Sequence, residues 1–196
     1  VLTNKKISDD LWYRNLVDVY EERFWQHWKD RLEKKDEAYS EFILDKIEKI
    51  IFYFDNKRYI DFFELFWDYD FKINKLDDRK NLKELIIWLK EIRQTWKVSD
   101  VFNYIYEKNI LYKNDKITKF KNDLLEKIDD SELLDRQNKN KKFQENLFSL
   151  EYKEFIRFNE YIENKTPYST QHWTKWAEYD NVLLVMDDSL WNMYNY

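Results

Sequence analysis

The chain has 196 residues with no glycine or cysteine, but it carries nine tryptophans, 15 tyrosines and 14 phenylalanines. The missing glycine excludes a phosphate loop or a GxGxxG turn, and the missing cysteine excludes disulfides and thiolate zinc sites. The net charge of −5 argues against a freestanding nucleic-acid binder. Apolar runs are too short to span a bilayer, and the start Val-Leu-Thr-Asn is not a signal peptide. We therefore expect a cytoplasmic fragment of a longer protein, with no membrane partner.

Most of the chain predicts helix. After Val1–Thr3, which we expect to end a strand, a short helix is predicted over Ile7–Leu11. Apolar residues at helical spacing predict a helix over Ser40–Phe54 with Ser40 as its N-cap. The same spacing recurs over Leu82–Ile92. Lys, Glu and Asp flank each apolar stripe, as on a solvated helix face.

The second half of the chain continues this pattern. Ser99 is predicted to cap a further helix, and the apolar residues of Ile117–Ile128 predict another. Phe143–Ile162 predicts a last pair of helices, broken near Ser149. The strongly polar stretch Asp135–Lys142 predicts an exposed joint between helices.

The character of the sequence changes near the C-terminus. Pro167, the only proline, ends the preceding helix, and Tyr168–His172 can then extend. Asn181–Met186 is a short apolar run of the kind buried in a parallel sheet. The predicted fold class is therefore mainly α, with a long helical region between two pieces of α/β character.

The segment Thr166–Val185, written TPYSTQHWTKWAEYDNVLLV, carries the candidate chemistry. Polar residues between two strands of a parallel sheet lie where α/β folds place ligand sites. Lys175 can meet a phosphate as a point charge, and Thr170 and His172 can donate to a nucleic-acid backbone. Glu178 can accept a hydrogen bond from a ribose hydroxyl. The alternative is an ordinary surface loop.

This segment resembles motif V of UvrD/Rep-type superfamily 1 helicases, whose pattern is T-x-H-x-x-K-G-x-E-(F/Y)-D-x-V before a core strand. Trp176 takes the place of the pattern's glycine. The positions that agree are Thr170, His172, Lys175, Glu178, Tyr179, Asp180 and Val182. The tail Trp191–Tyr196 and the stretch Leu150–Thr166 resemble one bacterial branch of the family. Val1–Asn4 and the helix after it resemble the opening of its second RecA-like domain.

The resemblance implies three parts. Residues 1–18 would be the opening strand and helix of the second RecA-like domain, residues 19–163 a helical insert subdomain, and residues 164–196 motif V with the core strand after it. The implied fold is a helical insert flanked by short parallel β-strands of an incomplete RecA-like α/β domain. The alternative, from another class, is an acidic all-α interaction or scaffold protein without catalysis.

The whole enzyme would be an ATP-dependent DNA helicase that uses ATP and Mg²⁺ and acts on single-stranded DNA or DNA junctions. Thr170, His172 and Lys175 would contact or line the DNA path. Glu178 would face the nucleotide, next to the family glycine position at Trp176. The phosphate loop, the magnesium-binding acids and the arginine finger would lie outside this chain. The chain alone would therefore hold no catalytic residue or metal and bind no cofactor.

Tryptophan stands at several positions where glycine is expected. Two follow predicted helix ends, one interrupts an apolar helix and two lie in the motif turn: Trp12, Trp96, Trp67, Trp173 and Trp176. One hypothesis explains them together with the missing glycine: the codon UGA, translated here as tryptophan, is read as glycine by the organism. The alternative is that the tryptophans are genuine and fill a helical core, which Trp88 suits. Trp191 fits the resemblance as a genuine tryptophan.

Two other patterns point less clearly to function. An aromatic–basic cluster, of the kind that holds single strands by stacking, comprises Arg23, Phe24, Trp25, His27, Trp28, Lys29 and Arg31. Phe24 and Trp28 are i,i+4 neighbours on a helix, which favours a packing pair. The acidic pairs of the chain lack EF-hand spacing, and two distant histidines give no zinc site.

Overall fold

The computed structural model describes residues 4–67, 75–108, 110–111, 114–126, 130–163 and 165–166, and the account below concerns these residues. Their regular secondary structure is helical, apart from one isolated antiparallel bridge between Lys97 and Glu151, and short turns join the helices. The prediction of a mainly α chain is confirmed. In chain order the helices are α1 (Asn4–Asp10), α2 (Arg14–Phe24), η1 (Trp25–His27), α3 (Trp28–Glu33), α4 (Ala38–Phe42), η2 (Ile43–Ile47), α5 (Glu48–Asp55), α6 (Tyr59–Trp67), α7 (Leu76–Ile92), α8 (Val98–Glu107), α9 (Asp115–Leu125), α10 (Ser131–Ser149) and α11 (Lys153–Ile162).

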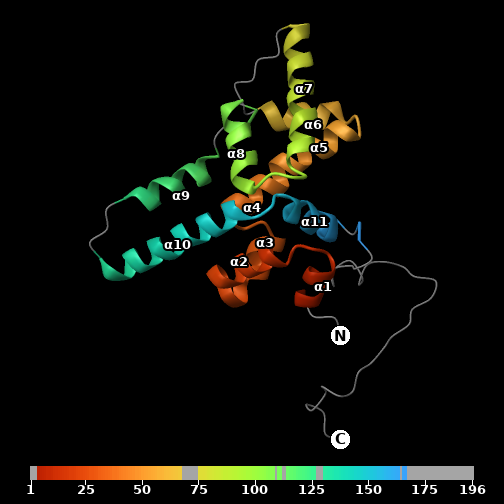
Figure 1. The fold of residues 1–196 in the computed structure, drawn as a ribbon. Helices are drawn as coiled ribbons and strands as arrows, with labels where there is room; N and C mark the ends of the chain where they lie inside the picture. Colours follow the sequence, from red (N-terminus) through yellow and green to blue (C-terminus); the bar gives the residue numbers. More distant parts are fainter. Residues whose placement is uncertain are drawn as a thin grey trace, which may run out of the picture.

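The helices surround a central rod made of α4, η2 and α5 (Figure 1). This rod is continuous, and η2 is a π-helical turn within it. Helices α1 to α3 lie at one end of the body, and α6 and α7 lie at the other. Helices α9 and α10 form a hairpin that projects from the side, and the C-terminal part of α10 packs against α2 and α8.

The core is rich in aromatic rings. Tyr39 of α4 lies at its centre, fully buried, with ring centroids 5.8 Å from Phe102, 5.6 Å from Phe120 and 5.3 Å from Phe148. All three contacts are edge-on, the arrangement that aromatic pairs favour. Large rings thus fill the space between α4, α8, α9 and α10.

Residues near the two ends of the helical body pack against each other. The Tyr13 ring, just before α2, lies 5.5 Å from Phe158 and 5.9 Å from Tyr161 of α11. The Glu154 carboxylate of α11 accepts hydrogen bonds of 2.8 Å from the Asn15 side chain and from the Leu16 amide. The chain therefore enters and leaves the helical body at one place.

Two predicted helix starts are corrected by the structure. The helix predicted over Ser40–Phe54 begins at Ala38, because Glu37 is the N-cap and its carboxylate accepts two amide hydrogens of the first turn. Ser40 is buried inside the helix and donates to the Glu37 carbonyl at 2.9 Å. Likewise Ser99 is the second residue of α8. A tertiary contact fixes that start, since the amide of Val98 donates to the carbonyl of Leu150 at 2.9 Å.

The exposed joint predicted over Asp135–Lys142 is also wrong, because this stretch lies within α10. Its polarity reflects solvent exposure along a projecting helix, and Lys139 pairs with Asp135 at 2.7 Å. Helix α7 contains the predicted Leu82–Ile92, and the predicted break near Ser149 separates α10 from α11.

The predicted strands fall outside the described residues, namely Val1–Thr3, Tyr168–His172 and Asn181–Met186. The flanking parallel β-strands therefore stay a prediction. The predicted helix Ile7–Leu11 appears as α1, over Asn4–Asp10. Helix α2 runs through residues 18 and 19, where the first predicted domain boundary lies.

Candidate functional site

The residues that the resemblance assigns to DNA binding and nucleotide coupling lie outside the described residues. They are Thr170, His172, Lys175, Trp176 and Glu178. Their roles stay predictions. Within the described part, the candidates are the aromatic–basic cluster at the end of α2 and a buried ionic network that sequence analysis did not find.

Phe24, the last residue of α2, lies beside two arginines. The guanidinium carbon of Arg23 is 5.2 Å from the Phe24 ring centroid, and that of Arg31 from α3 is 5.8 Å away. The Phe24 ring also packs edge-on against Phe143 of α10, with centroids 5.4 Å apart. Arg23 Nε donates to the Asn140 side-chain oxygen of α10 at 2.9 Å. We call these five residues the Arg–Phe cluster.

The Arg–Phe cluster carries positive charge at its rim. Burial, and then the charges of Arg136 and Arg31, lower the pKa of Arg23. Its partner Asn140 is neutral, so that hydrogen bond leaves the charge of Arg23 uncompensated. A group of this kind attracts phosphate. Lys142 of α10 pairs with Glu22 of α2 at 2.6 Å, so this neutral pair adds no net positive charge to the same two helices.

The cluster also differs from its predicted form. Phe24 and Trp28 do not share one helix, because a 3-10 turn over Trp25–His27 separates α2 from α3. Both side chains are half-buried against the core, but the rings next to Phe24 are Tyr20 and Phe143. The cluster therefore serves first to join α2 to α10.

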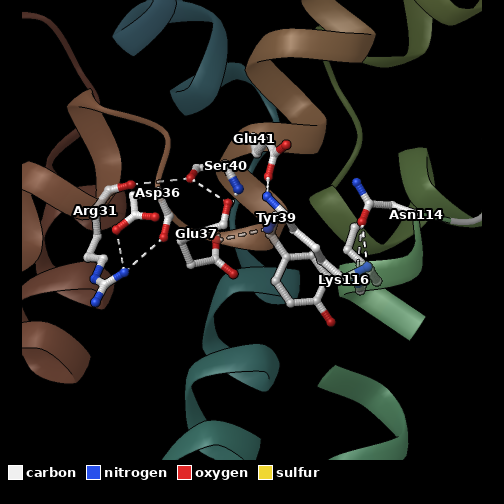
Figure 2. A network of polar contacts seen from close by, with 9 residues as sticks. Arg31, Asp36, Glu37, Tyr39, Ser40, Glu41, Asn114 and Lys116 are labelled. Carbon is white, nitrogen blue, oxygen red and sulfur yellow. Dashed lines mark hydrogen bonds and ion pairs between the residues drawn. The ribbon is translucent and has the colours of Figure 1, made fainter. Parts of the chain in front are cut away.

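A network of polar contacts holds Arg31 in place (Figure 2). Arg31 Nη1 donates to the Asp36 carboxylate at 2.5 Å and to the Asp36 carbonyl at 3.1 Å. The next residue, Glu37, accepts from two amides of α4 and from the Tyr20 hydroxyl at 2.8 Å. Burial raises the pKa of Glu37, although these hydrogen bonds act against it.

The same network extends to α9. Lys116 Nζ lies 2.5 Å from the Glu41 carboxylate of α4. Asn114 caps α9, its side-chain oxygen accepting from the Lys116 amide at 2.8 Å and from the Ile117 amide at 3.3 Å. These contacts, drawn in Figure 2, tie α3, α4 and α9 together.

A second set of charges is buried where α5, α7 and α11 meet. The Glu48 carboxylate accepts hydrogen bonds from Arg93 Nη1 and, at 2.9 Å, from the Tyr152 hydroxyl. The Glu48 and Arg93 side chains are only 6% and 11% exposed. Burial lowers the pKa of Arg93, but the Glu48 carboxylate outweighs it and the net shift is upward. Burial and the same carboxylate raise the pKa of Tyr152.

An open hollow of about 310 Å³ lies beside this network. Its lining includes the basic residues Lys49, Arg58 and Lys165 and the acidic residues Glu160 and Glu163. Because both signs are present, the lining favours no ligand of one charge.

Sequence analysis missed the buried ionic network, although a signal was present. Arg93 lies four residues after Leu89, and Glu48 lies four residues after Leu44, so each continues an apolar stripe. A charged residue at such a position predicts a buried, paired charge, since unpaired charges are rarely buried.

The described helices include none that is both long enough and apolar enough to cross a bilayer. The part of the chain that the structure describes holds no group of three His, Cys, Asp or Glu side chains arranged for a metal ion. Comparisons with protein-family models, with curated proteins and with solved structures give no match to this chain.

Proposed function

We propose that this chain is part of a UvrD/Rep-like, ATP-dependent DNA helicase that translocates on single-stranded DNA. The described helices would form a subdomain inserted between the opening strand of the second RecA-like domain and its motif V. The motif-like segment after residue 166 supports the chemistry, because seven of its positions agree with the pattern.

One structural observation supports an inserted helical unit. An insert must leave its host domain and return to it at nearly the same place. The contacts of Tyr13 with Phe158 and Tyr161, and of Glu154 with the start of α2, bring the two ends of the helical body together. Trp12 and Thr166 also line one hollow. The two ends of an ordinary single domain are also often close together. The proposal of a RecA-like host domain therefore rests on the sequence motif.

In the proposed enzyme, Thr170 and His172 would hydrogen-bond to DNA phosphates, which position a strand without reading its sequence. Lys175 would add a point charge beside that path. Glu178 would face the nucleotide. ATP and Mg²⁺ would be held mainly by residues outside this chain, and their chemistry would drive the relative motion of two RecA-like domains.

An acidic all-α interaction protein is the second candidate, and one observation favours it. Near the tip of the α9–α10 hairpin the side chains of Leu125, Leu133 and Leu134 are 82%, 51% and 43% exposed. Exposed leucines that gather on a projecting element are typical of a contact surface for another protein. The two candidates predict different behaviour toward nucleotide and DNA.

The deciding experiment measures ATP hydrolysis and single-stranded DNA binding by the protein encoded by the complete gene. The helicase proposal expects a phosphate loop upstream and DNA-stimulated hydrolysis. Lys175→Ala should weaken DNA binding equally for all sequences and reduce the salt slope by about one ion. Lys139→Ala, which removes an exposed lysine of α10, is the matched control and should change neither. A complete gene without a phosphate loop, or a protein without DNA-stimulated hydrolysis, contradicts the proposal.

A further inference from the structure

Among the described residues, three helices end in the same backbone motif. After α1, α3 and α5, one residue adopts a positive φ, namely Trp12 (63°), Lys35 (56°) and Lys57 (56°). In each case the amides of this residue and of the next one donate hydrogen bonds to carbonyls in the last turn of the helix. After α1, the Trp12 amide donates to Asp9 O at 3.2 Å and the Tyr13 amide to Ser8 O at 3.0 Å. This is the Schellman motif, whose left-handed C′ residue is usually glycine.

Lysine and tryptophan differ at such a position. Lys35 places its ammonium 2.7 Å from the Asp45 carboxylate, so its side chain gains a partner. The Trp12 side chain is 81% exposed, and its ring makes no stacking or cation–π contact with the described residues. A bulky residue in the left-handed region is a conformational outlier. Here no packing of the indole ring compensates for it.

Trp25 has a more restricted backbone. Its φ is 48° and its ψ is −118°, close to the first central residue of a type II′ turn, where glycine dominates. This residue follows the end of α2 and begins the 3-10 turn that separates α2 from α3. Its side chain is 72% exposed and likewise has no stacking or cation–π partner among the described residues.

Other described tryptophans behave differently. Trp28 is half-buried against the core. Trp96, predicted to stand at a helix-end position that favours glycine, has a negative φ, and its ring packs edge-on against Tyr104 at 6.5 Å. The backbone at position 96 therefore does not require glycine. Among the described tryptophans a positive φ is thus confined to Trp12 and Trp25, both exposed, in a chain that contains no glycine at all.

We infer that positions 12 and 25 are occupied by glycine in the native protein, because their codons are read as glycine in the organism that makes it. Only glycine adopts both backbone conformations without steric cost, and neither indole ring contributes packing. The inference is argued from two chain turns and does not rest on the proposed function. The same codon at position 176 would restore the glycine of the motif V pattern.

The direct test is mass spectrometry of the protein isolated from its own organism, together with the codons of its gene. The relevant tryptic peptides are Ile7–Arg14 and Phe24–Lys29. We expect UGA at codons 12 and 25, and peptides lighter by the difference between an indole side chain and a hydrogen atom at these positions. Tryptophan in either position, or UGG at either codon, overturns the inference.

A second measurement tests the physical reason. In recombinant protein that carries tryptophan, Trp12→Gly and Trp25→Gly should each raise the Tm by about 2–4 °C, because each removes the steric cost of a left-handed residue. Trp88→Gly is the matched control. Trp88 lies in the middle of α7 and is 49% exposed, so glycine there should lower the Tm. A lower Tm for both Trp12→Gly and Trp25→Gly contradicts the inference.

Discussion

Glu48 and Arg93 form an ion pair that is buried inside the protein. Removing either residue would leave the charge of the other buried without its ionic partner. Arg93→Met should lower the free energy of unfolding by about 3–5 kcal/mol, because it leaves the Glu48 carboxylate buried with only the Tyr152 hydroxyl as partner. Chemical denaturation followed by circular dichroism measures this change.

Two further variants separate the ionic effect from lost packing. Glu48→Met in the Arg93→Met background should recover much of the lost stability, since well-packed apolar residues can replace a buried ion pair. Arg157→Ala removes an exposed arginine that pairs with Glu160 at 3.0 Å, and it should cost no more than about 1 kcal/mol. A double variant as unstable as Arg93→Met would show that the carboxylate is not the cause.

Glu154 links pH to stability. Its carboxylate is 8% exposed, and burial raises its pKa despite the hydrogen bonds from Asn15 and Leu16. The folded state therefore holds the proton more tightly than the unfolded chain. Its contribution to the free energy of unfolding falls as pH rises above the unfolded-state pKa of about 4.3. Glu154→Gln cannot titrate, so its stability should decline less than that of the parent between about pH 4 and pH 7.

The control for this pH series is Glu145→Gln, which changes an exposed carboxylate of α10. Its stability profile should run parallel to that of the parent protein. Thermal unfolding at several pH values provides the comparison. If the Glu154→Gln profile were also parallel to the parent, the pKa of Glu154 would not be raised in the folded state.

Helix α10 is built in two halves with different support. Its buried residues, Phe143 and Leu147, lie in the C-terminal half, and the N-terminal half projects from the body (Figure 1). The projecting half depends on its cap, because the Asp130 carboxylate accepts from the Glu132 amide at 2.8 Å and the Leu133 amide at 3.1 Å. Local opening should therefore begin there.

Asp130→Ala should raise amide hydrogen exchange about fivefold in the first turns of α10, since a lost N-cap costs about 1 kcal/mol. Exchange near Phe143 and Leu147 should not change, because tertiary packing protects that half. Asp135→Ala, in the same exposed stretch but not at the cap, is the control. Equal effects from the two variants would remove the cap as the explanation.

Apolar spacing located most helices, but helix starts depended on contacts that spacing does not contain. Serine is a residue type that often caps helices, as predicted for Ser40 and Ser99. The start of α4 is instead set by the Glu37 cap, and that of α8 by the hydrogen bond from the Val98 amide to the Leu150 carbonyl. Asp135–Lys142 looked like a joint because polarity alone does not separate an exposed helix from a loop. The segment Thr166–Val185 carries the predicted site by its motif, and its residues after Thr166 lie outside the described residues.

The helical body has one core that draws on both ends of the described chain. Its buried cluster runs from Tyr13 to Tyr161, and α11 contributes rings that contact the first helices. Residues of α1 and α2 therefore belong physically with the helices after residue 19. A helical body with one such core should fold on its own, provided that both of its ends are retained.

A chain limited to residues 4–166 should accordingly keep its helical circular dichroism and a single unfolding transition, with Tm within about 2 °C of the full chain. Removing residues 150–196 is the informative counterpart. It deletes the buried rings of Tyr152, Phe155, Phe158 and Tyr161. Each such ring contributes about 1.5–3 kcal/mol, and together they approach the whole stability of a typical domain, about 5–15 kcal/mol. This shorter chain should be unfolded. If residues 4–166 were also unfolded, the helical body would not be self-contained and the inserted-subdomain proposal would lose its structural support.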